Sequence, residues 1–346
     1  MKNLFICHTQ AQLILASGLV RGRFKEDIND LILFVDFGLT QRQKERLNGT
    51  FNRILFLQSI YPAEYNTLRA KLKWYPNDWK EIKKFVYDKF DRAFAVCDWL
   101  LLVQKTLKRV YSINASVEIA WLEDGITAYY SDSDMRGGLD SNSLTSGLRK
   151  FLFKYLLGAG KFYDRDFRET GGLKCLKTVY TCYPNSVREP YRSRRELIEI
   201  TDEEYMLGLR AIYETCSLDL KLPAVILVVD KLDRYEHPEI VKDSIIRFIR
   251  ESRREGKKVI CKFHPRETMI WEVFDDCQHI DKSIGIENTY LSLMPQKDLV
   301  TIAGIKSTGL MSAKKLGFHT LSLFMKCGED NRNLISFYNG LGIDLV

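Results

Sequence analysis

The sequence predicts an α/β protein of two lobes, each built on a mainly parallel sheet wrapped by helices. The chain has 346 residues with 45% hydrophobic content, which is enough for two globular domains with cores of their own. Short apolar runs alternate with helix-like segments in both halves. The longest runs, such as residues 31–35 and 224–229, have the length of strands and fall far short of the about 20 residues that span a bilayer. These observations argue against an integral membrane protein.

Strand-like runs in the first half are rich in β-branched and aromatic residues and are bounded by turn formers. They cover residues 3–7, 30–36, 53–57, 92–97 and 116–122. Between them, residues 10–20 carry apolar side chains at helical spacing behind Thr9, a good cap, and residues 79–90 repeat a helical pattern. The alternation predicts a parallel sheet for this lobe.

The second half restarts the alternation after a Pro-containing, basic passage at residues 184–195 that follows a strand at 178–182. We place the domain boundary there, which gives lobes of residues 1–190 and 191–346. Strands are expected at 224–229, 258–263, 299–303 and 320–324, and helices at 239–255, after Ser307 and at 331–341.

Cysteine usage and charge bear on the compartment and on partners. None of the eight cysteines forms a CxxC pair, so we expect buried thiols in a reducing compartment such as the cytoplasm, with neither a disulfide framework nor a zinc site. The apolar stretch after Met1 is too short for a secretory signal. Much of the net charge of +7 lies within residues 149–195, which suggests an acidic surface or an anionic substrate, or only a solvated face.

An acidic motif follows the strand at 116–122, where the chain continues Glu123-Asp124-Gly125. Successive side chains at a strand end point to opposite sides, so only one carboxylate can face a ligand at the sheet edge. That one is a candidate general base for a sugar hydroxyl, and partial burial near another carboxylate would raise its pKa. The alternative is a helix cap by Asp124 with Glu123 solvated.

A His-Pro motif ends the strand at 258–263. Pro265 fixes the chain direction directly after His264 and so holds the imidazole at the sheet edge. An imidazole there can donate to a phosphate oxygen or protonate a leaving group near neutral pH. The second His-Pro pair, His237-Pro238, follows a hydrophilic run and is expected to begin a helix.

Two further segments follow strands. After residues 299–303 come Gly304, Lys306, Ser307 and Thr308, which predict a glycine turn and a helix N-terminus. Free N–H groups, a hydroxyl and the helix dipole would bind a nucleotide phosphate there, or Ser307 would serve only as a cap. After the first strand, Thr9 and Gln12 could face a sugar, or they could merely cap the first helix.

Other patterns exclude functions or carry little weight. Asp132-Ser133-Asp134 has the form of a metal-binding Asp-x-Asp but lies in a small, polar loop, so we expect no metal. The chain contains neither GxxxxGK[ST] nor GxGxxG after the first strand, which argues against an NTPase and a dinucleotide oxidoreductase. No nucleic-acid-binding signature occurs. Residues 148–157 are apolar with interspersed basic residues, as in a helix on an anionic membrane surface or one packed on its own domain.

Taken together, the motifs resemble those of bacterial sialyltransferases. Glu123-Asp124-Gly125, His264-Pro265 and Ser307-Thr308 stand in that family's order, with one motif in the first lobe and two in the second. The opening Cys7-His8-Thr9-Gln10-Ala11-Gln12-Leu13 is also similar to the start of the lipooligosaccharide sialyltransferases, glycosyltransferase family 52, and of related polysialyltransferases. Two lobes facing across a cleft make the GT-B arrangement of glycosyltransferases.

The resemblance implies an inverting, metal-independent transfer of a nonulosonic acid from its CMP-activated form to a sugar hydroxyl, without a cofactor. In that scheme Glu123, in preference to Asp124, is the base, His264 interacts with the departing CMP phosphate, and Ser307 and Thr308 hold it. The resemblance further implies a homodimer that associates peripherally with the inner membrane to reach lipooligosaccharide or capsule acceptors.

Two rival hypotheses remain. One is another GT-B enzyme that uses a UDP-sugar or CMP-Kdo, for which Glu329 or Asp330 would be a carboxylate near the ribose. The other is a non-catalytic protein that binds anions or polysaccharides through the basic residues between 149 and 195, with salt-sensitive affinity.

Overall fold

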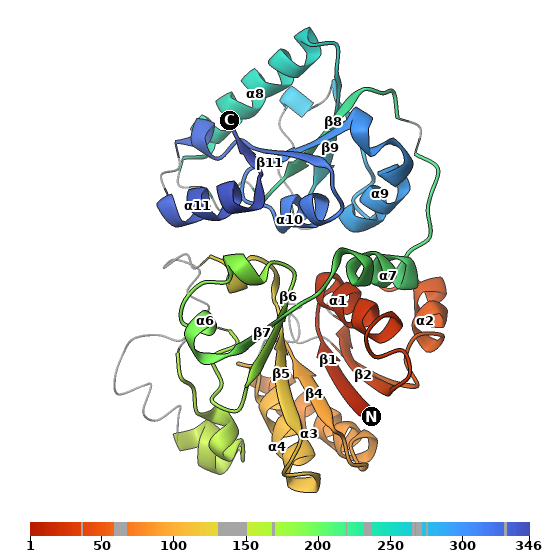
Figure 1. Cartoon of the computed structure of the whole chain (residues 1–346), viewed down its shortest axis with the longest axis vertical. Helices are drawn as coiled ribbons and strands as arrows, with labels where there is room; N and C mark the ends of the chain where they lie inside the picture. The colour runs from red at the N-terminus through yellow and green to blue at the C-terminus, as the bar shows by residue number, and fades with distance from the viewer. Residues whose placement is uncertain are drawn as a thin grey trace. The chain divides into compact units, whose positions relative to one another are not determined.

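The computed structural model divides into two compact units, Met1–Ile212 and Tyr213–Val346, each described here by itself (Figure 1). It describes residues 1–35, 37–58, 68–130, 151–167, 170–218, 220–231, 235, 237–264, 267, 272–274, 276–328 and 331–346. Asp36 and Pro265 of the predicted elements, the Asp132-x-Asp134 pattern, and Glu329 and Asp330 lie outside these residues.

The first unit is built on a seven-stranded parallel sheet of order β3-β2-β1-β4-β5-β6-β7. Its strands are β1 (Lys2–Cys7), β2 (Ile28–Val35), β3 (Arg53–Gln58), β4 (Arg92–Ala95), β5 (Glu118–Leu122), β6 (Thr178–Thr181) and β7 (Glu196–Glu199). Its α-helices are α1 (Gln10–Arg21), α2 (Gln41–Asn48), α3 (Leu68–Phe85), α4 (Leu101–Ile113), α6 (Tyr191–Arg194) and α7 (Asp202–Ile212). The order reverses between β1 and β4, and open α/β sheets bind ligands at such a switch point.

The second unit repeats this plan with a six-stranded parallel sheet of order β10-β9-β8-β11-β12-β13. Its strands are β8 (Ala224–Val229), β9 (Lys258–Phe263), β10 (Gln278–His279), β11 (Val300–Gly304), β12 (His319–Ser322) and β13 (Asp344–Leu345). Its helices are α8 (Pro238–Arg254), α9 (Ile286–Leu293), α10 (Thr308–Lys315) and α11 (Arg332–Leu341). Here the switch point lies between β8 and β11.

The predicted strands and long helices are confirmed in kind, most of them within a few residues at each end. The helix expected at 79–90 instead runs from Leu68 to Phe85. α8 begins at Pro238 behind His237, as the second His-Pro pair predicted. All eight cysteines are free, and six of them are buried. Among the described residues, no helix is both long and apolar enough to cross a membrane.

The boundary between the units falls later than the sequence suggested, because β7 and α7 complete the first unit. β7 pairs with β6 in register. α7 crosses α1 through two glycines: a Cβ on Gly18 would lie 2.1 Å from the Glu204 carbonyl oxygen, and one on Gly208 would lie 2.0 Å from that of Ile14. Only glycine permits so close an approach of two helix backbones. The first unit therefore extends to Ile212 and not to residue 190.

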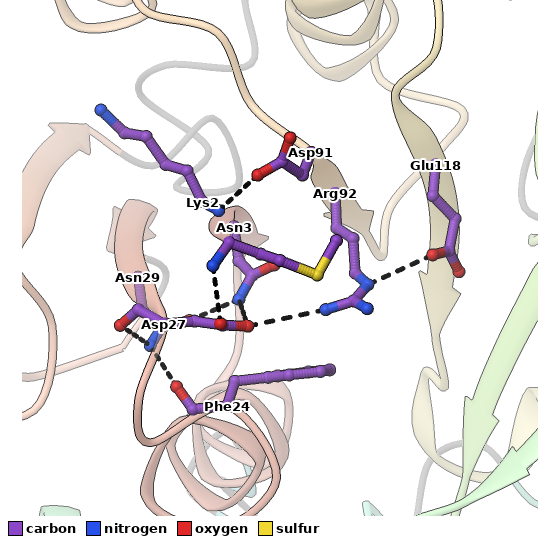
Figure 2. A network of polar contacts seen from close by, with 9 residues as sticks. Lys2, Asn3, Phe24, Asp27, Asn29, Asp91, Arg92 and Glu118 are labelled. Carbon is purple, nitrogen blue, oxygen red and sulfur yellow. Dashed lines mark hydrogen bonds and ion pairs between the residues drawn. The ribbon is translucent and has the colours of Figure 1, made fainter.

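Charged and polar side chains form a network of hydrogen bonds and ion pairs at the amino ends of strands in the first unit (Figure 2). The Asp27 carboxylate accepts from the Asn3 side-chain amide at 3.1 Å and from the Met1 ammonium at 2.8 Å. Arg92 lies 3.6 Å from Asp27 and donates to Glu118 at 3.2 Å. This network joins β1, β4 and β5 at the edge opposite their carboxyl ends, where the predicted motifs lie.

Candidate active site

Four neighbouring strands of the first unit end in polar residues at the switch point. His8 follows β1, Asp98 follows β4, Glu123 and Asp124 follow β5, and Thr181 ends β6. Because the strands are parallel, their carboxyl ends meet at one edge of the sheet. The acidic motif and the Thr9-Gln12 segment are thus brought together, as their positions after strands predicted.

Glu123 turns into the protein. Its side chain is 4% exposed, and its Oε2 atom accepts from the Thr181 hydroxyl at 2.8 Å, the Cys182 N–H at 2.8 Å and the Tyr129 hydroxyl. Burial raises the pKa of Glu123, while these three hydrogen bonds work in the opposite direction. The carboxylate therefore ties the end of β5 to the end of β6.

Asp124 points the other way and is partly exposed. Its Oδ1 atom accepts from the Gln12 side-chain amide at 2.7 Å. Burial raises the pKa of Asp124, the Gln12 hydrogen bond and the charge of His8 lower it, and the nearby Asp98 raises it further. Its side chain makes no capping hydrogen bond to the 3₁₀ turn Gly125–Ala128, so the interpretation of Asp124 as a helix cap is wrong.

Thr9 and Gln12 form a capping box at the start of α1, so this alternative for them is confirmed. The Thr9 hydroxyl accepts from the Gln12 N–H at 3.4 Å. The Gln12 side chain is 1% exposed and bonds to the backbone of His8 and Thr9 as well as to Asp124. Its contact with the acidic motif is a feature that the sequence did not reveal.

Asp98 is a second buried carboxylate at this edge that sequence reasoning missed. It is fully buried, and Arg165 donates to both of its oxygens at 3.0 Å. The Leu173 N–H adds a hydrogen bond of 3.1 Å. Burial nevertheless raises the pKa of Asp98. Its position just after a strand was the available signal, but no motif drew attention to it.

The second unit gathers its motifs around Asp230, which follows β8 at the switch point. The Asp230 Oδ2 atom accepts from the Lys306 N–H at 3.0 Å and from the Tyr235 hydroxyl at 2.9 Å. Burial raises the pKa of Asp230, while the charge of His264 and a hydrogen bond from Ser307 lower it. Asp230 therefore faces both the His-Pro motif and the Ser/Thr motif, although the sequence placed it only in a hydrophilic run.

The Ser/Thr motif forms a helix start. Ser307 caps α10 and accepts from the Gly309 N–H at 3.2 Å, and Thr308 is the first residue of the helix. A Cβ on Gly304 would lie 3.2 Å from the Val228 carbonyl oxygen, so the turn approaches β8 closely. The Lys306 ammonium lies over the rings of Tyr235 and Phe324, at 5.5 and 5.3 Å from their centroids. The motif thus combines a cap with the groups of an anion site.

His264 lies directly after β9, where its N–H donates to the Val229 carbonyl at 2.9 Å. That hydrogen bond continues the β8–β9 ladder past the end of the strand. The histidine therefore has a fixed backbone next to Asp230 at the edge of the sheet.

A buried polar cluster beneath the start of α10 was also missed. Glu287 is 9% exposed, burial raises its pKa, and the Ser312 hydroxyl donates to it at a long 3.4 Å. The hydroxyls of Tyr290 and Tyr213 have no hydrogen-bond partner among the described residues. Lys262 is 3% exposed, and burial lowers its pKa to about 8. Buried hydroxyls without partners are uncommon in proteins and mark a place that a polar ligand or water can fill.

Comparison with known proteins gives structural likeness alone. No protein-family model matches the sequence, and no curated protein sequence matches it either. Among solved structures, the UDP-GlcNAc 2-epimerase of Neisseria meningitidis bound to UDP-GlcNAc is 10% identical with a TM-score of 0.57, covering 100% of this chain and 87% of its own.

Two further structures are similar over nearly the whole chain. The α/β-galactoside α-2,3-sialyltransferase of Photobacterium phosphoreum is 10% identical, with a TM-score of 0.54 and coverage of 99% of this chain and 98% of its own. The UDP-GlcNAc 2-epimerase of Methanocaldococcus jannaschii is 14% identical, with a TM-score of 0.53 and coverage of 100% and 89%. At such identities the likeness establishes the fold. The chain has the GT-B-type fold of two Rossmann-like lobes that its strand alternation predicted.

Proposed function

We propose that the protein is an inverting, metal-independent glycosyltransferase that moves a nonulosonic acid from its CMP-activated donor to a hydroxyl of a surface glycan. The observation that carries the proposal is the set of polar groups at the carboxyl edge of each of the two sheets. One presents a partly exposed carboxylate among buried polar partners, and the other presents a histidine and a helix N-terminus joined through one aspartate. The first suits proton removal and the second suits a departing phosphate.

Asp124 is the proposed base. Glu123, which the family resemblance favoured, is occupied by three donors and almost fully buried. Asp124 has one oxygen held by Gln12, and its Oδ2 atom makes no hydrogen bond among the described residues. That oxygen would accept the proton of the acceptor hydroxyl. Burial raises the pKa of Asp124, which makes the carboxylate a better proton acceptor near neutral pH.

His264, Ser307 and Thr308 are proposed to bind the donor phosphate, with Gly304 and Lys306 shaping the turn. The free N–H groups and the dipole at the start of α10 favour an anion. Asp230 lies close enough to His264 for the two charges to interact, and it also accepts the Lys306 N–H, so it joins the histidine to the helix start. A protonated His264 stabilises the charge that develops on the leaving phosphate or donates its proton to it. In this scheme the positive charge of His264 and the dipole of α10 stabilise the leaving phosphate in place of a metal ion.

Glu287 is the proposed contact for the ribose of the donor. A carboxylate accepts from both hydroxyls of a ribose, and the unpartnered Tyr290 hydroxyl lies under the same helix start, 3.3 Å from the position of a Cβ on Gly309. This cluster suits any ribonucleotide. The choice of CMP over UDP therefore rests on the family resemblance and needs a direct test.

Calorimetric titration of CMP tests the donor half of the proposal, with UMP as the competing nucleotide. CMP binding should weaken at least about tenfold in His264→Ala, the loss of one charge-assisted hydrogen bond. The matched control is His237→Ala, which removes the other His-Pro histidine, exposed at the start of α8. Equal affinity of His264→Ala and wild type for CMP would contradict the phosphate role, and tighter binding of UMP would favour the UDP-sugar alternative.

We also propose that residues 151–157 rest on an anionic membrane surface. Several apolar side chains of this segment are exposed, with Phe151 at 53%, Tyr155 at 66% and Leu156 at 68%. The adjoining Leu148 to Lys150 lie outside the described residues. When the protein is sedimented with vesicles that contain phosphatidylglycerol, Leu156→Glu should stay in the supernatant and Leu299→Glu should pellet with the vesicles. Leu299 is the control because it is a leucine of the second unit that is 54% exposed. Equal binding of the two variants would refute this surface. We further propose that the protein is a homodimer, and analytical ultracentrifugation would measure its oligomeric state.

A further inference from the structure

We infer that Gln12 is a positioning residue for Asp124: its side-chain amide holds one carboxylate oxygen, so that the other faces the acceptor hydroxyl. The inference rests on the proposed role of Asp124 as base. It gives Gln12 a different task from the sugar contact that the sequence suggested.

Two backbone N–H groups fix the orientation of the Gln12 amide. The His8 N–H donates to Gln12 Oε1 at 2.7 Å, and the Thr9 N–H donates to the same oxygen at 3.1 Å. Only the amide oxygen can accept these bonds, so the NH₂ group must occupy the other position. There it donates to Asp124 Oδ1 at 2.7 Å and lies 3.8 Å from the Cys97 sulfur.

The amide joins three strands at the switch point. Gln12 lies in the first turn of α1 directly after β1, Cys97 follows β4, and Asp124 follows β5. Because the side chain is 1% exposed, water does not compete for these hydrogen bonds. A donor in that place stabilises the charged form of Asp124 and leaves Oδ2 to take a proton.

Other charges face Asp124 from the neighbouring strands. The charge of His8, after β1, favours the ionised carboxylate, and Asp98, after β4, opposes it. Asp98 is itself paired with Arg165. Glu123, the neighbour in sequence, points into the β5–β6 junction. Gln12 contacts the carboxylate through a direct hydrogen bond, so a change in its charge should act on Asp124 most strongly.

The chain contains a matched control for any change at Gln12. Thr40 and Gln43 form the same capping box at the start of α2, with the Thr40 N–H donating to Gln43 Oε1 at 2.9 Å. The Gln43 NH₂ group donates to no described residue. A third box, at the start of α7, already uses glutamate: the Thr201 N–H donates to Glu204 Oε2 at 3.0 Å. Glutamate is therefore compatible with the box. Gln12→Glu differs from Gln43→Glu in the group beyond the box and in burial, since Gln12 is 1% exposed and Gln43 is half-buried, and adding Asp124→Asn to Gln12→Glu separates these two effects.

The test compares thermal unfolding of wild type, Gln12→Glu, Asp124→Asn, the double variant and Gln43→Glu at about pH 4 and about pH 7. Gln12→Glu places a second carboxyl group within hydrogen-bonding distance of Asp124. The folded protein should therefore favour the form in which the two groups share one proton. Their folded pKa lies above the unfolded one, so stability is present at low pH and is lost as pH rises. Gln12→Glu should therefore lose several degrees of Tm at the higher pH only, and Gln43→Glu should not.

The double variant gives the reciprocal arrangement, in which the side-chain amide introduced by Asp124→Asn can donate to the carboxylate introduced by Gln12→Glu. It should recover most of the Tm that Gln12→Glu loses. Where the single variant does not fold at neutral pH, recovery of folding by Asp124→Asn carries the same information.

The pH profile of kcat/KM gives the catalytic readout. The acidic limb reports deprotonation of the base in the free enzyme, and it should move by about one unit or more to higher pH in Gln12→Glu while staying in place in Gln43→Glu. A purely structural role would lower the rate without moving the limb. An unmoved limb, or a Tm loss that Asp124→Asn does not relieve, overturns the inference. Absence of any turnover by wild type would instead refute the proposed function, while the unfolding series would still decide the role of Gln12.

Discussion

Glu123 and Asp124 are adjacent in sequence but should respond to substitution in opposite ways. Glu123 Oε2 accepts three hydrogen bonds inside the protein, whereas Asp124 is partly exposed and held by Gln12 alone. Glu123→Gln keeps an acceptor oxygen for the same three donors, so its free energy of unfolding should stay within about 1 kcal/mol of wild type. Its kcat/KM should remain within about tenfold of wild type, because Asp124, the proposed base, is untouched.

Removing the Glu123 carboxylate altogether should affect stability more than Glu123→Gln does. Glu123→Ala removes the acceptor of three buried hydrogen bonds, at about 1 kcal/mol or more for each, so the variant should lose at least about 3 kcal/mol of stability, even though the Tyr129 and Thr181 hydroxyls still bond to each other at 2.7 Å. Asp124→Asn should fold normally and lose about 10² to 10⁴-fold in kcat/KM, the usual contribution of a general base.

The assays are urea unfolding and turnover of CMP-sialic acid. Because burial raises the pKa of Glu123, the folded state favours its protonated form, and the contribution of this one group to wild-type stability falls as pH rises above about 4. The stability of Glu123→Gln relative to wild type should therefore improve over that range. A stable Glu123→Gln enzyme that loses as much activity as Asp124→Asn would refute this division of roles.

Three further changes test other parts of the structure. Gly208→Ala puts a Cβ 2.0 Å from the Ile14 carbonyl and should cost about 3 kcal/mol or more in denaturant unfolding, while Gly38→Ala, with nothing within 4 Å, should cost little. For Asp27, burial raises the pKa, but hydrogen bonds from the chain's ammonium terminus and the Asn3 amide more than offset this, so the pKa lies below its usual value. Its stabilising effect is therefore present at neutral pH and lost on acidification, and Asp27→Asn should lower Tm at about pH 7 but not below about pH 3. Glu287→Gln should weaken binding of CMP by about tenfold and leave binding of inorganic phosphate unchanged, and equal loss for both ligands would contradict a ribose contact.

The sequence predicted the two-lobed α/β fold and the position of each motif after a strand, because strand periodicity and turn residues are local features. It could not decide between Glu123 and Asp124. That choice depends on the pairing of β5 with β6, which brings Thr181 to Glu123 from 58 residues away.

The buried carboxylates at the carboxyl edges of the two sheets could not be predicted from the sequence for a similar reason. Asp98 and Asp230 belong to no recognisable motif, and their importance lies in the loops they bind, through Arg165 and through the Lys306 backbone. The boundary of the first unit was displaced because the Gly18 and Gly208 contact joins helices far apart in sequence. Long-range packing of this kind leaves no mark on a local pattern.

The most direct test of the proposed function is the release of CMP from CMP-sialic acid in the presence of EDTA. Wild type should release CMP, and His264→Ala should release at least about 10²-fold less, since the imidazole is proposed to act on the leaving phosphate. His237→Ala should match wild type. No release by wild type, together with no binding of CMP, would contradict the assignment of a CMP-activated donor.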